Sequence, residues 1–170
     1  HGFCYGVKRA VEMADEAANS KGKSYTLGPI IHNPQVVGRL ESKGVSPIQE
    51  VADIDEGTMI IRSHGVGPAI YAEAEEKGLH ILDATCPHVK KAQQDAKSVI
   101  EDGMTLVILG EKNHPEVKSI NLWANNKGII IEDEESAQKL QIVEKMGVVV
   151  QTTFSQFKFN SIIEILEKKS

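Results

Sequence analysis

The sequence predicts an α/β protein with two pseudo-repeated units, each built around a parallel sheet. The segment Cys4-Tyr5-Gly6-Val7-Lys8-Arg9-Ala10 returns later as Cys86-Pro87-His88-Val89-Lys90-Lys91-Ala92. Short runs of Val, Ile and Leu alternate with helical segments, which is typical of parallel sheets covered on both faces. The offset between the two cysteines also relates Gly28 to Gly110 and His32 to His114.

The first unit is expected over residues 1–86. Apolar residues recur at helical spacing over residues 5–20, and Gly22 ends this helix. Proline favours the first position of a helix, so Pro34 and Pro68 open two further helices. The remaining apolar runs predict strands over residues 24–27, 59–61 and 81–82.

The second unit, expected over residues 87–170, repeats this order. It begins with a helix over residues 87–101 and a strand over residues 106–109, and Pro115 opens the next helix. We then expect strands over residues 129–131 and 148–150, a short acidic helix over 134–140, and a last helix marked by Phe159, Ile162, Ile163 and Leu166.

Charge and composition narrow the classes of function. The formal net charge is −5 without a basic stripe, so we expect no nucleic-acid partner. No apolar run approaches the ~20 residues that a membrane span needs, and no secretory signal opens the chain. We therefore expect a cytoplasmic protein with no membrane partner and with reduced thiols. Because the chain begins with His1 rather than Met, we also expect residues before it.

Reactive side chains follow the strands in both units. In parallel α/β folds, the loops at the carboxyl ends of the strands hold ligands. Repeats usually preserve their apolar pattern and let their surfaces vary, so shared reactive residues indicate that both copies contribute to one site. These residues are Cys4, His32 and His64 in the first unit and Cys86, His114, Thr152 and Thr153 in the second.

The two cysteines admit several interpretations. They can be inert thiols, a disulfide or zinc ligands, although they are scattered rather than in the local pairs of structural zinc sites. Each stands before a helix N-terminus, which favours the thiolate. Iron–sulfur clusters accept thiolates from distant segments. The repeat predicts a third cysteine beyond Ser170, and three thiolates on a four-iron cluster would leave one iron open to a substrate oxygen.

The histidines favour an anion with several oxygens. His32 and His114 are expected at helix N-termini, where unpaired amides and the helix dipole attract phosphate or diphosphate, with His64 and Thr152 nearby. A single histidine is more often a solvated or core residue, but three at equivalent strand ends favour binding. Glu116, in the first turn after His114, is either a proton donor or an ordinary surface carboxylate.

Six short motifs occur in order along the chain. They are Gly2-Phe3-Cys4-x-Gly6-Val7, His32-Asn33, Ser63-His64-Gly65-Val66, Asp83-Ala84-Thr85-Cys86-Pro87, His114-Pro115-Glu116-Val117 and Gln151-Thr152-Thr153. Together they resemble the 4-hydroxy-3-methylbut-2-enyl diphosphate reductase family, which acts last in the methylerythritol phosphate route to isoprenoids. The resemblance implies a three-unit, pseudo-threefold architecture around an iron–sulfur cluster, with two of the units in this chain.

The resemblance also implies residue roles and a reaction. Two electrons and two protons would remove the allylic hydroxyl of the diphosphate substrate, giving isopentenyl and dimethylallyl diphosphate, with ferredoxin or flavodoxin as electron donor. Glu116 would deliver protons, with His114 and Thr152 as further catalytic groups. The remaining roles are cluster ligands for a [4Fe-4S] cluster (Cys4, Cys86), diphosphate contacts (His32, His64, His114) and hydroxyls near the substrate (Thr152, Thr153).

The chain departs from the family pattern at both ends. It lacks the opening strand before the first Cys, the third cysteine, and the Ser-x-Asn and later Ser that complete the diphosphate pocket. We therefore expect the third unit to be missing and this chain by itself to be inactive. Two rival hypotheses are a non-catalytic α/β module that binds a phosphorylated metabolite, and a protein stabilised by zinc or a disulfide at Cys4 and Cys86. Iron and sulfide analysis separates them.

Overall fold

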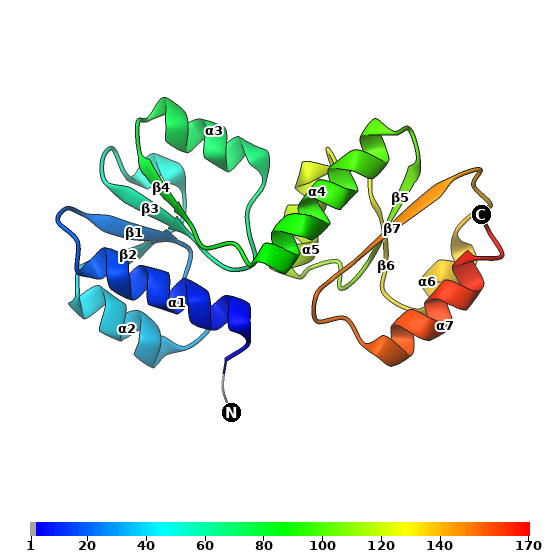
Figure 1. Ribbon diagram of the computed structural model, residues 1–170, viewed down its shortest axis with the longest axis horizontal. Coiled ribbons are helices and arrows are strands. Elements are labelled where there is room, and N and C mark those ends of the chain that lie inside the picture. The colour runs from blue at the N-terminus through cyan, green and yellow to red at the C-terminus, as the bar shows by residue number, and fades with distance from the viewer. Residues whose placement is uncertain (1–2) are drawn as a thin grey trace. The chain divides into compact units, whose positions relative to one another are not determined.

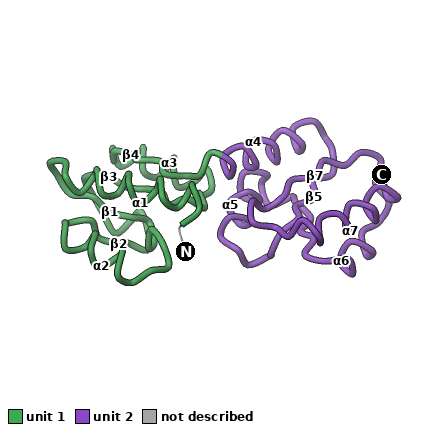
Figure 2. The backbone as a smooth tube through the Cα atoms, turned by 60° about the horizontal axis from the view of Figure 1, so that its bottom comes forward, with its two compact units in different colours: residues 1–87 green, residues 88–170 purple. Residues whose placement is uncertain are grey.

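The computed structural model describes residues 3–170, and the chain forms two compact units, residues 1–87 and 88–170 (Figures 1 and 2). Each unit has its own parallel sheet and its own apolar core. His1 and Gly2, and with Gly2 the first position of the Gly2-Phe3-Cys4 motif, lie outside the described residues.

Unit 1 is a four-stranded parallel sheet in the order β2-β1-β3-β4, flanked by helices. Its elements are α1 (Tyr5–Ala18), β1 (Ser24–Leu27), α2 (Pro34–Ser42), β2 (Val45–Ile48), the 3₁₀ helix η1 (Val51–Asp53), β3 (Thr58–Ile61), α3 (Pro68–Glu76) and β4 (His80–Asp83).

The central strand β3 divides the core of unit 1 into two layers. Met59, Ile60 and Ile61 are fully buried. Successive side chains of a strand point to opposite faces, so Ile60 packs with α1 and α2, whereas Met59 and Ile61 pack with α3 and η1. Both faces of the sheet are therefore covered.

Unit 2 is a three-stranded parallel sheet in the order β6-β5-β7. Alternate residues of its central strand divide the core in the same way: Leu106 and Ile108 pack with α4 and α5, and Val107 and Leu109 pack with α6 and α7. The elements of unit 2 are α4 (Pro87–Glu101), β5 (Thr105–Leu109), α5 (Pro115–Trp123), β6 (Ile129–Ile131), α6 (Glu134–Lys139), β7 (Met146–Val150) and α7 (Gln156–Leu166).

The expected α/β class, the parallel sheets and the repeated order of elements are confirmed. In unit 1, β1 follows α1 and lies between β2 and β3; in unit 2, β5 follows α4 and lies between β6 and β7. Most expected boundaries are within a few residues of the observed ones, although the first helix ends at Ala18. In the described part of unit 2, β4 has no counterpart.

One strand, β2, was not predicted. It contains Pro47, which has no N–H and is normally a signal against a strand interior. The structure accommodates it because β2 is the edge strand and pairs on one side only, with β1. The apolar signal was also weak, since only Val45 and Ile48 of the four residues are buried.

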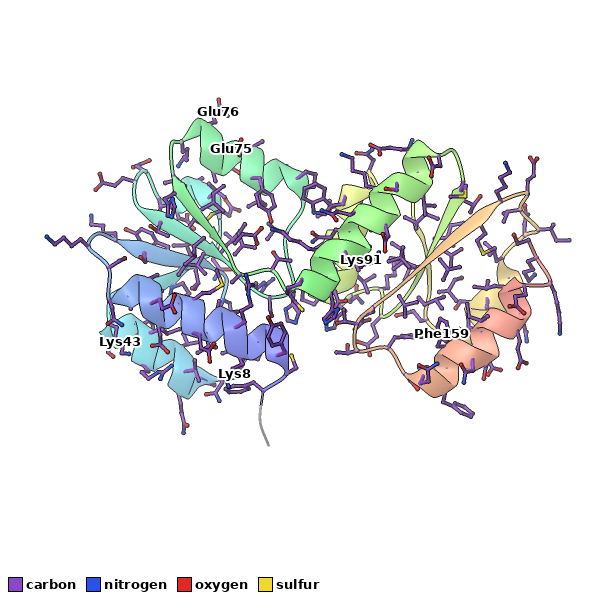
Figure 3. All side chains as sticks on the ribbon, in the orientation of Figure 1. Lys8, Lys43, Glu75, Glu76, Lys91 and Phe159 are labelled. Atoms are coloured by element: carbon purple, nitrogen blue, oxygen red, sulfur yellow. The ribbon has the colours of Figure 1, made fainter. Side chains whose placement is uncertain are left out.

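Charged side chains lie on the outer faces of the helices. Lys8, Glu75 and Lys91 are exposed and point away from their sheets (Figure 3). Lys91 pairs with Asp95, one turn further along α4, at 2.8 Å. Within residues 3–170, every helix is too short or too polar to cross a membrane.

Gly57, where β3 and β4 begin, gives a test of the fold. Its φ is +107°, and a Cβ there would lie 2.6 Å from the carbonyl oxygen of Lys23, which accepts a hydrogen bond from Thr58 N. We expect Gly57→Ala to lower the free energy of unfolding by about 2–4 kcal/mol, through backbone strain and this clash.

Gly22→Ala is the matched control for this variant. Gly22 has nearly the same φ, +109°, but no atom lies within 4 Å of its ideal Cβ. Gly22→Ala should lower the free energy of unfolding by the backbone strain alone, about 1–2 kcal/mol. Urea denaturation measures both variants, and equal losses would show that the contact with Lys23 does not matter.

Candidate functional site

In unit 1, the segments after β3 and β4 carry two of the predicted site residues, His64 and Cys86. Backbone pairing continues past the ends of these strands: Ala84 N donates to Ile61 O at 2.9 Å, and Cys86 N donates to Ser63 O at 2.9 Å. The extended pairing places Cys86 beside Ser63, at the carboxyl edge of the sheet. His64 follows directly at the same edge and is partly buried.

Cys86 also packs on the first turn of α1. A Cβ on Gly6 would lie 2.8 Å from both Cβ and Sγ of Cys86, so the helix backbone is in direct contact with this thiol. Cys4 is the N-cap of α1 and is exposed. The structure therefore brings both cysteines to the N-terminal end of one helix. Both thiols are free, so they do not form the disulfide considered from the sequence.

His32 lies just before α2 and is exposed. The N-cap of this helix is the next residue, Asn33, whose Oδ1 accepts hydrogen bonds from Gln35 N at 3.0 Å and Val36 N at 3.2 Å. The expected helix N-terminus after His32 is confirmed. Asn33, and not His32, is the side chain that accepts hydrogen bonds from the first amides of α2.

In unit 2, His114 itself is the N-cap of α5. Its Nδ1 accepts a hydrogen bond from Glu116 N at 3.1 Å. This nitrogen therefore carries no proton, and in the neutral ring the proton is on Nε2. The expectation that His32 and His114 are matched in the two units is wrong by one position: in the structure Asn33 matches His114, because each caps its helix.

The carboxylate of Glu116 is buried, with 2% exposure. Its Oε1 accepts a hydrogen bond from Thr152 N at 2.7 Å, and its Oε2 accepts one from Thr152 Oγ1 at 2.8 Å. Thr152 follows β7 and is exposed. The alternative that Glu116 is an ordinary surface carboxylate is therefore wrong. The structure joins Glu116 and Thr152, which sequence analysis had named separately.

Gln151 organises the loops beside this pair. It is buried, its Oε1 accepts a hydrogen bond from Glu111 N at 2.9 Å, and its Nε2 donates to Thr153 Oγ1 at 3.0 Å. It thus ties the loop after β5 to the hydroxyl of the exposed Thr153. A polar residue between an apolar strand and two threonines was the available signal, but the role of Gln151 depends on a contact with Glu111, which is distant in sequence.

Three residues around Cys86 were not named as site residues. Asp83 accepts hydrogen bonds from Thr85 N at 3.0 Å on Oδ1 and from Tyr71 Oη at 2.8 Å on Oδ2. Arg9 donates from Nη1 to Thr85 O at 3.3 Å. Burial first, and then the bond to Asp83, raise the pKa of Tyr71 well above its ordinary value. Asp-x-Thr after a strand is a pattern of Asx turns and could have identified Asp83.

Arg62 was also missed, although it immediately follows β3. Its Nε is buried and has no hydrogen-bond partner among residues 3–170. Burial lowers the pKa of the guanidinium from a high starting value, so the group stays charged near neutral pH. It therefore places a positive charge at the edge that carries His64.

The cysteines cannot complete a metal site by themselves. Among residues 3–170 there is no group of three or more His, Cys, Asp or Glu side chains that could hold a metal ion.

The chain is similar in sequence to known reductases. The family model described as "LytB protein" matches residues 1–170. A protein of Pelobacter propionicus named 4-hydroxy-3-methylbut-2-enyl diphosphate reductase is 50% identical over 169 residues, which are 98% of this chain and 60% of that protein. One of the same name from Geobacter sulfurreducens is 47% identical over 163 residues, which are 96% of this chain and 58% of the relative.

Two solved structures share the fold. The E-1-hydroxy-2-methyl-but-2-enyl-4-diphosphate reductase of Plasmodium falciparum matches with a TM-score of 0.90 and 32% identity, over 99% of this chain and 54% of that one. A structure of (E)-4-hydroxy-3-methyl-but-2-enyl diphosphate reductase matches with a TM-score of 0.86 and 44% identity, over 98% and 61%. The chain spans about 60% of the length of the curated relatives it matches. On its sequence and its fold, this chain belongs to the LytB protein family.

Proposed function

We propose that this chain, within a protein of its relatives' length, reduces 4-hydroxy-3-methylbut-2-enyl diphosphate to isopentenyl and dimethylallyl diphosphate. Relatives at 44–50% identity carry the name of this reductase. The observation that carries the proposal is the buried carboxylate of Glu116, bonded on both oxygens by Thr152. A buried acid behind an exposed hydroxyl serves proton transfer, which a module that only binds phosphate does not need.

The reaction requires two electrons and two protons. The bond between carbon and the hydroxyl oxygen breaks, one proton joins the oxygen, which leaves as water, and the other joins the carbon skeleton. We assign the proton for the oxygen to Glu116. Thr152 Oγ1 donates to Glu116 Oε2 at 2.8 Å; once the carboxyl group is protonated, this hydrogen bond can reverse, so that the hydroxyl takes the carboxyl proton and passes its own proton outward.

Each unit supplies groups suited to diphosphate. The N-termini of α2 and α5 offer positive potential next to His32 and His114 respectively. Because His114 Nδ1 accepts from the backbone, Nε2 is the nitrogen that donates to a phosphate oxygen. His64 is the third proposed contact, and the charge of Arg62 favours an anion at that edge. Such local charge offsets the formal net charge of −5.

The cysteines fit an iron–sulfur cluster as two of its ligands. Both thiols are free and lie at the N-terminal end of α1, where the helix dipole provides positive potential. Because Gly6 has no side chain, Cys86 can pack directly against the first turn of α1. When bound, a [4Fe-4S] cluster would supply the electrons and a Lewis acid for the substrate oxygen.

The proposal extends to the partners of the reaction. A third cysteine would come from a third α/β unit outside this chain, and ferredoxin or flavodoxin would supply the electrons. The reaction would take place in the cytoplasm, where thiols stay reduced.

Glu116→Gln tests the proton path. Glutamine keeps an acceptor for Thr152 N but has no carboxyl proton, so in the full-length protein turnover should fall by about 10² or more. Diphosphate binding and cluster content should stay near those of the parent protein. Glu111→Gln is the control, because Glu111 is an exposed carboxylate in the loop that leads from β5 to α5. Steady-state kinetics with a chemical reductant decides, and near-normal turnover of Glu116→Gln would remove this residue from the mechanism.

His114→Asn separates binding from folding. Asparagine is a good N-cap, so α5 and the unfolding temperature should persist. The variant loses the donor on Nε2, and substrate affinity should fall by roughly tenfold or more, since a hydrogen bond to a charged group contributes about 1.5–3 kcal/mol. Calorimetric titration of the full-length protein measures the change, and unchanged affinity rejects His114 as a diphosphate contact.

Gly6→Ala tests the fit of the cluster. The added Cβ would contact Cys86 at 2.8 Å, and relieving that overlap costs about 1–3 kcal/mol and displaces the thiol. Iron and sulfide bound after anaerobic assembly of the full-length protein should fall. Gly38→Ala in α2 is the control, because nothing lies within 4 Å of its ideal Cβ. Zinc in place of iron, or equal iron in both variants, would contradict this assignment.

A further inference from the structure

We propose that Asp83 and Tyr71 are positioning residues that hold the thiol of Cys86 in place. The inference deepens the proposed function, because it rests on Cys86 as a cluster ligand. Asp83 and Tyr71 would hold Cys86 in position before any cluster is bound.

The segment that carries Cys86 needs an anchor. Within residues 3–170 it follows an edge strand, β4, which pairs with β3 on one side. Backbone bonds on that one side hold Ala84 and Cys86, and one-sided pairing at a strand end opens more easily than pairing within a sheet. The carboxylate of Asp83 closes the turn by accepting a hydrogen bond from Thr85 N, one residue before the thiol.

Tyr71 fixes this carboxylate from a different element. It lies on α3 and donates from its hydroxyl to the second oxygen of Asp83 at 2.8 Å. Burial and the bond to Asp83 raise the pKa of Tyr71 above its ordinary value, so this hydroxyl stays a donor near neutral pH. Without it, the partly buried carboxylate would lose a partner and turn toward water, which weakens its hold on Thr85.

The peptide before Cys86 is therefore held from both faces of the sheet. Thr85 N is bound through Asp83 to α3, and Thr85 O is bound by Arg9 of α1. α3 packs on one face and α1 on the other. Since α1 also carries Gly6, which contacts the thiol, a shift of this peptide moves Sγ relative to that helix. Groups that orient a metal ligand in this way commonly affect metal affinity and redox behaviour.

Alkylation of the metal-free chain tests the inference without a cluster. Cys86 is partly buried against Gly6, whereas Cys4 is exposed, so Cys4 serves as the internal reference. Iodoacetamide labelling under native conditions, located by peptide mass spectrometry, gives the ratio of the two rates. In Tyr71→Phe and Asp83→Asn we expect this ratio of Cys86 to Cys4 to rise on the order of tenfold, the effect of losing a hydrogen bond to a charged group.

Tyr25→Phe is the matched control, because Tyr25 packs against the same apolar cluster as Tyr71. Its ratio should stay at the parent value. An unchanged ratio in both Tyr71→Phe and Asp83→Asn would overturn the proposal. So would an equal acceleration at both cysteines, since that shows general loosening of unit 1 rather than positioning of one thiol.

A second measurement links the pair to the cluster. In the full-length protein after anaerobic assembly, Tyr71→Phe should keep the iron content while shifting the electron paramagnetic resonance signal of the reduced cluster, and Tyr25→Phe should not. An identical signal in Tyr71→Phe would count against the proposal. If no cluster assembles even in the parent protein, the proposed function fails, while the alkylation ratio still decides whether Asp83 and Tyr71 position Cys86.

Discussion

Parallel pairing of the strands is the constraint on which the rest of the structure depends. Because all strands of a unit run the same way, every loop after a strand leaves from one edge of its sheet, and helices must cover both faces. In unit 1 that edge carries His64 and Cys86. In unit 2 it carries the segments of His114 and Thr152. Residues far apart in the chain become neighbours within each unit for this reason alone.

Each unit presents different chemical groups at the carboxyl edge of its own sheet. In unit 1, Cys86 N pairs with Ser63 O after β3, and Asp83 and Arg9 bind the backbone of the preceding residue, Thr85. In unit 2, a carboxylate is buried, and burial without partners would be costly. Two hydrogen bonds from Thr152 satisfy Glu116, and its place in the first turn of α5 suits a negative charge. The duplication thus preserved the scaffold and changed the groups it presents.

Much of the fold could be predicted because its signals are local. The apolar run of β3 and the prolines that open α2, α3 and α5 identify elements without tertiary information. β2 escaped because Pro47 is tolerated only at an edge, and no local pattern says which strand will be the edge. The offset that aligned His32 with His114 was also misleading, since capping depends on which side chain reaches the helix amides, and in α2 that is Asn33.

The sequence by itself determined the α/β class, the order of the main elements other than β2, and the placement of Cys86, His64 and His114 after strands, because periodicity and turn chemistry act over a few residues. Only the tertiary structure decided which atoms meet. Glu116 could have been a solvated carboxylate until α5 and β7 brought Thr152 to it, and Cys86 could have been any exposed thiol until α1 placed Gly6 against it. Such contacts follow from distances between elements that packing sets and that no local pattern encodes.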